Sequence, residues 1–287
     1  ILLIMKINNY LKLFIVFFIL SLFVSIKDNL FQNYSLLFMP KEYKTIKKLV
    51  DKIAAKNYLG DKEIPFFIGS GKYMQVRGKE LGLCNEEDCW YFNNLSPYKK
   101  YKNVQGINLS ELVNQAYLFN GIEAYAWKGI VWLSKSTFRT YGDRNDWLSC
   151  TIGHELSHIV FNDHIEQGIK LIEKLDELKI KDLEKIEEKE ELLDLQINRE
   201  SEKIADNNAA KMIINTGYPK QTCLEELTFL TTSLKLPVDT KNDFSHPGYQ
   251  ERFNSLNKFI DNYEKEKYLN SFKPYKWKWS YDRKNKI

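Results

Sequence analysis

The chain has 287 residues and a mass of 34.0 kDa, which is enough for one large domain or two small ones. Its hydrophobic content of 44% and aromatic content of 14% can fill a core, so the composition excludes a largely disordered chain. The formal net charge of +4 is small for this length and, without a nucleic-acid-binding motif, argues against DNA or RNA as a partner.

The N-terminal stretch has the pattern of an export signal. Lys6 and Lys12 precede an apolar run over residues 13–26, which is 14 residues long. A spanning helix needs about 20 residues, whereas a shorter run suits the apolar region of a signal peptide. No small-residue cleavage motif follows. We therefore expect residues 1–26 to be a signal peptide or an N-terminal inner-membrane anchor, and the chain to be exported to the periplasm or cell envelope.

Two helices and a strand are expected in the part of the chain that follows. Residues 41–59 have apolar positions at helical spacing and end at Gly60, which predicts an amphipathic helix. Residues 64–68 form a short apolar run typical of a strand. A polar capping residue at the start of residues 108–119 predicts a second helix.

The four cysteines do not have the spacing of a zinc site. Cys84 and Cys89 lie in a polar turn within residues 72–103, where we expect short strands and loops, and they could close a disulfide in an oxidising compartment. Cys150 and Cys223 lie in helical, partly apolar surroundings, so we expect buried inert thiols at both positions.

Residues 123–134 predict a β-hairpin, because two β-rich runs flank a Lys-Gly turn at residues 128–129. The edge of such a strand can pair with an extended peptide. We therefore expect substrate contacts from Val131, Trp132 and Leu133, with a plain core hairpin as the alternative.

Residues 151–161 contain the motif His154-Glu155-Leu-Ser-His158 within an apolar helical run. Histidines at i and i+4 lie one turn apart on the same helix face, so both rings can reach one zinc ion. The glutamate between them can take a proton from a water that the ion activates. Gly153 precedes the motif, and a glycine inside a helix is expected where another backbone packs closely. A chance match on a charged helix is the alternative.

Residues 165–197 combine apolar positions at helical spacing with dense mixed charge. This pattern is typical of a long helix or a helical hairpin that projects from the body of a protein. The charged surface is either a solvated face or an arm that gates the site or docks a partner.

Residues 199–217 predict a helix that carries two further candidates. Glu202 and Asp206 lie at i and i+4 on one face, near alanines that allow close packing on the motif helix. A catalytic zinc takes three protein ligands and keeps one position open, so Glu202 can be the third ligand. Asp206 can accept a hydrogen bond from the free ring nitrogen of a ligating histidine. An ordinary surface helix is the alternative.

The C-terminal part of the chain adds three polar candidates. A helix is expected at residues 222–235, and His246, Tyr249 and Arg252 follow it. Imidazole, phenol and guanidinium groups can all stabilise an oxyanion, and we expect Tyr249 to contact substrate. His246 could instead close the metal site and make it latent. The basic, aromatic tail at residues 275–286 suits either contact with an anionic membrane surface or an ordinary packed tail.

Four segments in this order resemble gluzincin metallopeptidases of the HtpX and CAAX-prenyl endopeptidase type, which include periplasmic single-domain members. They are E-A-Y-A-W-K-G-I-V-W-L at residues 123–133, H-E-L-S-H at 154–158, E-K-I-A-D at 202–206 and H-P-G-Y-Q-E-R at 246–252. The chain departs from this family at Glu123, where asparagine is common, in its long charged arm, and in lacking the multiple transmembrane helices of HtpX-type members.

The resemblance implies one zinc ion per chain, bound by His154, His158 and Glu202. It also implies Glu155 as general base and acid. The remaining implied site residues are Asp206 behind the ligands, and His246 and Arg252 lining the site.

The sequence therefore predicts an α+β fold, mainly helical, with a small β-sheet flanking the motif helix. The metallopeptidase domain is expected to span residues 27–287, with the charged helical arm 165–197 inserted. The predicted function is zinc-dependent hydrolysis of peptide bonds in unfolded or unassembled envelope proteins. One alternative is a zinc-containing chaperone or scaffold that binds unfolded clients without cutting them. A second is a zinc hydrolase that acts on a non-peptide amide.

Overall fold

The computed structural model describes residues 36–61, 63–85, 87–178, 183–241, 246–264 and 277–282, together with Phe14. The chain divides into two compact units, residues 42–277 and the terminal segments 1–41 with 278–287. Apart from Phe14, the expected signal or anchor at residues 1–26 lies outside the described residues, as does part of the basic tail. No helix in the described part of the chain combines the length and apolar character needed to cross a bilayer.

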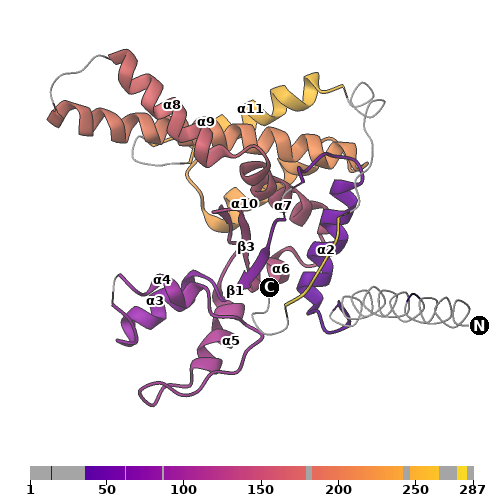
Figure 1. The fold of residues 1–287 in the computed structure, drawn as a ribbon, viewed down its shortest axis with the longest axis vertical. Coiled ribbons are helices and arrows are strands. Elements are labelled where there is room, and N and C mark those ends of the chain that lie inside the picture. The colour runs from indigo at the N-terminus through magenta and orange to yellow at the C-terminus, as the bar shows by residue number, and fades with distance from the viewer. Residues whose placement is uncertain are drawn as a thin grey trace, which may run out of the picture. The chain divides into compact units, whose positions relative to one another are not determined.

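The unit 42–277 is mainly helical and contains a three-stranded sheet (Figure 1). This confirms the predicted α+β fold with a small sheet. The helices are α2 (Lys41–Ala54), α3 (Lys72–Glu80), α4 (Trp90–Asn93), α5 (Leu109–Phe119), α6 (Lys135–Tyr141), α7 (Asn145–Val160), α8 (Asp163–Leu178), α9 (Leu183–Asn215), α10 (Thr222–Leu234) and α11 (Tyr249–Asn262). The strands are β1 (Phe66–Gly69), β2 (Ala124–Trp127) and β3 (Ile130–Ser134).

The sheet has the order β1-β3-β2, with β3 parallel to β1 and antiparallel to β2. β2 and β3 form the predicted hairpin, and its turn residues Lys128 and Gly129 have φ values of 47° and 81°, as a tight hairpin turn requires. The structure does not place the expected substrate contacts Val131, Trp132 and Leu133 at a free edge of the sheet. These residues belong to the central strand and are at most 3% exposed, so both edges of their backbone are already paired. Among the described strands, β2 is the one with a free edge near α7.

Residues 72–103 form helices α3 and α4 rather than the expected short strands and loops. Side chains from far along the chain hold the start of α3. The amide of Lys72 donates to the Glu123 carboxylate at 2.9 Å, and the amide of Tyr73 donates to Asn120 Oδ1 at 2.8 Å. A helix start that is capped from a distance of about 50 residues leaves no local capping signal.

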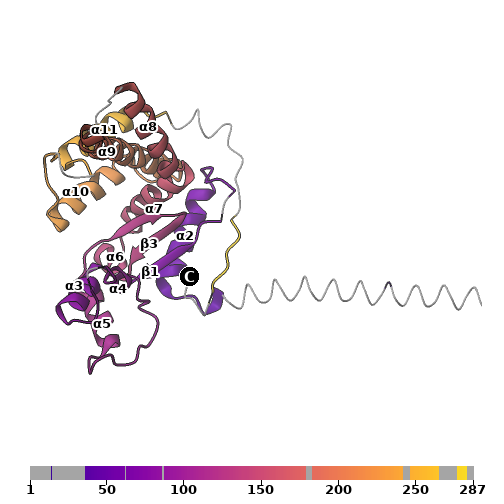
Figure 2. The ribbon, with the colours of Figure 1, turned by 60° about the vertical axis from the view of Figure 1, so that its left-hand side comes forward.

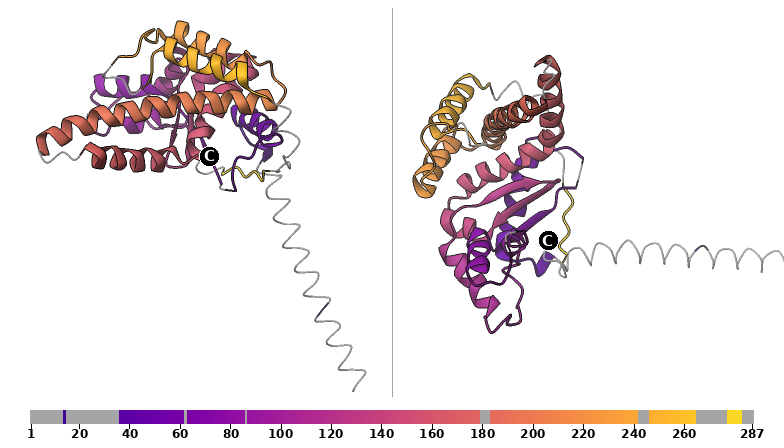
Figure 3. Two further views of the ribbon diagram at one scale, coloured as in Figure 1. Left: turned by 90° about the horizontal axis from the view of Figure 1, so that it is seen from above. Right: turned by 90° about the vertical axis from the view of Figure 1, so that its left-hand side faces the viewer.

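Helix α7 lies between the sheet and a layer formed by α9, α10 and α11, while α3, α4 and α5 gather on the other side of the molecule (Figure 2). α11 runs along α9 (Figure 3). The expected close packing at Gly153 is confirmed, because a Cβ built there would lie 3.3 Å from the Cα of Ala209 on α9. The buried Ala205, Ala209 and Ala210 allow this approach.

Helices α8 and α9 form the charged arm as a helical hairpin that extends beyond the other helices (Figure 1). α9 is one continuous helix of 33 residues. It therefore contains both the arm and the expected Glu202 helix, and no structural boundary falls at residue 197. On α8, the side chains of Ile165, Ile169 and Ile172 are 47–69% exposed.

All four cysteines are paired in disulfides. Cys84 is joined to Cys89, within the polar turn. The expectation of inert thiols at Cys150 and Cys223 is wrong, because these residues are joined across 73 positions of sequence. Their bond links α7 to α10. The even number of cysteines in a chain expected to be exported was the available signal.

The two disulfides are expected to differ in their contribution to stability. Replacing both Cys150 and Cys223 by serine should lower the free energy of unfolding by about 4 kcal/mol, and replacing both Cys84 and Cys89 by about 2 kcal/mol, because the longer loop restricts the unfolded chain more. Denaturant unfolding of the oxidised wild type and both double variants measures the difference. A larger loss for the short loop would contradict it.

Candidate metal centre

His154 and His158 of α7 and Glu202 of α9 converge at one point. The two Nε2 atoms lie 3.1 Å apart. Glu202 approaches both rings, with Oε2 at 3.2 Å from Nε2 of His154 and Oε1 at 3.5 Å from Nε2 of His158. The three residues are half-buried, and one ligand atom from each lies within 4.8 Å of the others. The i, i+4 spacing on α7 accounts for the histidine pair, and the close packing of α9 brings the carboxylate to it.

A carboxylate accepts a hydrogen bond from the Nδ1 atom of each histidine ring, on the side away from Glu202. His154 donates from Nδ1 to Asp206 at 2.9 Å, and His158 donates from Nδ1 to Asp163 at 2.8 Å. Asp206 therefore lies where the sequence placed it. Asp163 was not predicted from the sequence, because this residue follows the motif helix after a turn and is not at a helical spacing from His158. In that turn Asn162 has a φ of 53°. An acidic residue soon after the second histidine was the only signal.

The chemistry of this donor set fits a metal cation. With both ring protons on Nδ1, the two Nε2 atoms are both acceptors, and at 3.1 Å they repel each other unless a metal ion or a proton lies between them. Two tetrahedral nitrogen ligands at 2.0–2.1 Å from one zinc ion lie roughly 3.3 Å apart. Two histidines and one glutamate also form a ligand set of catalytic zinc sites, which keep a fourth position open. Within the described residues this is the single group of its kind, so the site fits one ion per chain.

Arg252 of α11 holds Asp206. Its Nε and Nη2 donate to the two carboxylate oxygens at 2.8 and 2.6 Å, in a bidentate pair. Burial alone would raise the pKa of Asp206, but the guanidinium outweighs it and keeps that pKa well below its usual value. Asp206 is therefore a charged acceptor for His154. These contacts favour a positioning role for Arg252 over the predicted contact with an oxyanion.

The protonation of the cluster also follows from its contacts. Burial opposes the charged form of His154, but the hydrogen bonds to Asp206 and Glu202 prevail and raise its pKa well above the usual value. Burial raises the pKa of Glu202, yet the His154 ring more than offsets this and lowers it to about 2. A zinc ligand must be the neutral imidazole, so His154 releases a proton when a metal binds.

Glu155 lies on α7 between the two histidines and is 6% exposed. Burial raises the pKa of its carboxyl group, and the neighbouring His154 and His158 rings offset part of this effect. A general base is most effective when its pKa lies near the working pH, so the shift suits proton transfer. Glu155 borders a cavity of about 200 Å³, which His154 and Glu202 also line.

His246 borders the cavity beside the metal centre, whereas Tyr249 does not. His246 has its Nε2 at 3.6 Å from Glu202 Oε1 and a side chain that is 64% exposed. The Tyr249 hydroxyl lies 3.1 Å from Thr228 Oγ1 on α10, and Tyr249 is not among the residues that line the cavity. The structure does not bring Tyr249 to this cavity, and its contact with substrate stays a prediction. Its position at the start of α11 turns the ring toward α10.

A model of peptidase family M48 matches residues 102–260, which is more than half of the 287-residue chain. The matched region contains the hairpin, α7, α9 and most of α11, and therefore all three candidate ligands. The chain belongs to peptidase family M48. Searches of curated proteins and of solved structures found no match. As an M48 member the chain is a metallopeptidase, a hydrolase of protein or peptide substrates, and M48 enzymes are typically zinc-dependent.

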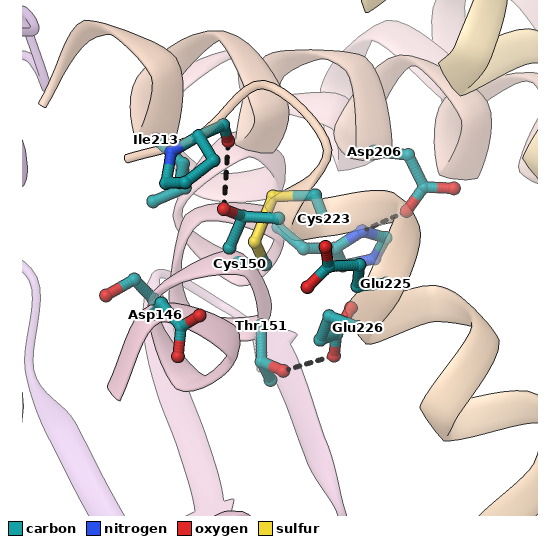
Figure 4. The surroundings of a disulfide bond; sticks show 12 residues. Asp146, Cys150, Thr151, Asp206, Ile213, Cys223, Glu225 and Glu226 are labelled. Carbon is teal, nitrogen blue, oxygen red and sulfur yellow. Dashed lines mark hydrogen bonds and ion pairs between the residues drawn. A yellow bond between two sulfur atoms is a disulfide. The ribbon is translucent and has the colours of Figure 1, made fainter. Parts of the chain in front are cut away.

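One buried acidic residue in this M48 domain was not expected from the sequence. Glu226 of α10 is 6% exposed, lines the cavity and accepts hydrogen bonds from the Tyr141 hydroxyl and, at 2.9 Å, from Thr151 Oγ1. Figure 4 shows Glu226 facing Thr151 beside the Cys150–Cys223 disulfide. Its signal was a glutamate within the apolar stripe of a predicted helix. Burial raises its pKa to about 7, and the two hydroxyl donors offset part of this shift.

In this M48 peptidase, Asp206→Asn and Asp163→Asn should each weaken zinc binding by about 10–100-fold, because each histidine loses the carboxylate that fixes its tautomer. Competition with a chromophoric chelator measures the affinity. Asp143→Asn serves as the control, because Asp143 lies in the turn before α7 and the start of this helix is roughly 20 Å from His158 at a rise of 1.5 Å per residue. Unchanged affinity in both variants would contradict the assigned contacts.

Glu226→Gln should change the pH dependence of folding. The folded carboxyl has a pKa of about 7 against an ordinary value of 4.5, so its proton stabilises the fold below pH 4.5 and this contribution is lost as the pH rises through 7. Relative to the wild type, the metal-free variant should gain about 3 kcal/mol between low pH and about pH 8. Denaturant unfolding across this range measures the gain. A difference that does not vary with pH would contradict it.

Proposed function

We propose that this M48 metallopeptidase is a zinc-dependent endopeptidase of the HtpX and CAAX-prenyl endopeptidase type, and that it removes unfolded or unassembled proteins of the cell envelope. The observation that carries the proposal is the convergence of His154, His158 and Glu202 beside the buried carboxyl of Glu155. We propose an exported chain in which residues 1–26 are the signal or anchor, and residues 27–287 form the peptidase domain with its inserted arm.

His154, His158 and Glu202 would hold the zinc ion, which when bound supplies a Lewis acid that polarises a carbonyl and lowers the pKa of water. Asp206 and Asp163 keep each ring proton on Nδ1, so that both Nε2 atoms face the site. The Glu155 carboxylate accepts the proton of the attacking water and then delivers it to the leaving amine. We propose that the free edge of β2 pairs with an extended peptide, and the position of Ala124 of this strand at the same cavity supports this.

The test compares one substrate protein in its folded and in its unfolded state. The full chain loaded with zinc is expected to cut the unfolded form much faster, because an extended segment must reach both the β2 edge and the metal centre. Removal of zinc with a chelator should stop the cleavage, and added zinc should restore it. No cleavage of either form by the zinc-loaded chain would overturn the proposal.

The second candidate function is a latent peptidase or scaffold that binds unfolded clients without cutting them. His246 favours it, because its Nε2 lies 3.6 Å from Glu202 and could close the open position of the site. His246→Ala separates the candidates. Increased cleavage of the unfolded substrate would support latency, whereas decreased cleavage would support stabilisation of the oxyanion by the ring. Membrane-surface contact by the basic tail remains a prediction.

A further inference from the structure

The cavity beside the metal centre contains a carboxylate that the peptidase chemistry does not use. Both hydrogen bonds to Glu226 end on Oε1, which accepts from Tyr141 and from Thr151. Among the described residues none donates to Oε2. Oε2 is not among the fully buried atoms that lack a partner, so it faces the space of the cavity. A ligand group that enters the cavity can donate a hydrogen bond to it.

Arg252, which lines the same cavity, does not donate a hydrogen bond to Glu226 Oε2. Arg252 is the arginine in the cavity lining, and its Nε and Nη2 both donate to Asp206. The Glu226 charge is therefore influenced by Arg252 at a distance but receives no hydrogen bond from it. The carboxylate favours a positive group that comes from outside the chain.

The rest of the cavity wall near Glu226 is apolar. Leu227, Leu230 and Leu234 follow Glu226 along the same face of α10 at helical spacing, and all of them line the cavity. Leu236 and Ile122 add to this surface. An apolar wall with a single carboxylate suits a long side chain that has an aliphatic stem and a cationic end, which describes lysine and arginine.

Two links fix Glu226 relative to the catalytic helix. Thr151, which holds Oε1, lies on α7 three residues before His154. The Cys150–Cys223 disulfide joins α7 to α10 one turn before Glu226 (Figure 4). The carboxylate is therefore held in place before any substrate arrives, as selective recognition requires.

We propose that Glu226 is a specificity-determining residue, and that this cavity takes the lysine or arginine side chain of a residue next to the scissile bond. The inference rests on the proposed peptidase function. The aliphatic part of that side chain packs on the leucines of α10, and its ammonium or guanidinium group donates to Oε2. A basic side chain is thereby preferred over a neutral one of similar length and over an acidic one.

The experiment uses the full zinc-loaded chain at about pH 8, where the Glu226 carboxyl is ionised. A peptide library first shows which positions around the scissile bond are selective. Four matched peptides then carry lysine, methionine, glutamine or glutamate at the selected position. The wild type should prefer lysine over methionine by about 10–100-fold in kcat/KM, the range expected of a charged hydrogen bond. Glu226→Gln should bring this ratio close to one.

Glu226→Gln should also raise the cleavage of the glutamate peptide relative to the methionine peptide, because a repulsion is removed. A purely structural defect would not produce that gain. Glu225→Gln is the matched control, because Glu225 is the adjacent carboxylate, with a side chain that is 57% exposed. It should leave all ratios unchanged.

The outcomes are distinguishable. Cleavage of the library without a preference for lysine or arginine at any position next to the cut overturns this inference alone. A lysine preference that persists in Glu226→Gln also overturns it. Failure to cleave any peptide overturns the proposed peptidase function, and this inference with it.

Discussion

Glu155→Gln is expected to lower kcat/KM for peptide cleavage by about 10²–10⁴-fold, the range that general acid–base catalysis supplies. Glutamine has the shape of glutamate but no basic carboxylate, so it accepts no proton. The three metal-binding side chains are untouched, and zinc content should stay at about one ion per chain. Cleavage of a fluorogenic peptide and metal analysis of the same sample measure both quantities.

The combination of the two measurements is what makes this result informative. Loss of zinc together with activity would show that Glu155 supports the metal centre rather than proton transfer. Full activity in the variant would contradict the proposed role outright. Glu225→Gln removes a carboxylate from the exposed side of α10 and should leave both quantities at their wild-type values.

Glu202→Gln is expected to abolish stable zinc binding. A neutral amide oxygen is a far weaker zinc ligand than a carboxylate, and even loss of an outer hydrogen-bond partner weakens binding by about 10–100-fold, so loss of a ligand should exceed about 100-fold. Activity at ordinary zinc concentrations should be lost with the metal. Competition titration against a chelator measures the affinity.

Glu200→Gln provides the control for this experiment. Glu200 lies two positions before Glu202 on α9, and residues two apart in a helix point in different directions. Both variants remove one negative charge from the same turn, so a difference between them reflects ligation rather than net charge. Equal zinc affinity in the two variants would contradict the assignment of Glu202 as a ligand.

The parts of the site that were predictable from the sequence lie on single helices. The 3.6-residue period places His154 beside His158 and Glu202 beside Asp206, and the small residues at Gly153 and Ala209 indicate that the two helices touch. The hairpin was predictable for a similar reason, since its turn and both strands are adjacent in sequence. The roles of these residues remain predictions, whereas their convergence in space is observed.

The parts that were missed depend on contacts between distant segments. The sequence indicated a hairpin but not which of its strands would pair with β1, and therefore placed the substrate contacts on the buried strand. It contained no local signal for the bond between Cys150 and Cys223, or for the capping of α3 by Asn120 and Glu123. Glu226 was overlooked because a glutamate in an amphipathic helix is ordinarily exposed.

The continuity of α9 connects the tip of the arm mechanically to the metal centre. The helix contains no glycine or proline between Leu183 and Asn215, so it has no sequence-encoded hinge. Glu202 lies 19 residues from its first residue, which at 1.5 Å per residue makes a lever of roughly 28 Å. A force on the outer end of the arm would therefore turn α9 about its contact with α7 and move the Glu202 side chain. The rigidity of this one helix thus determines how precisely Glu202 is positioned.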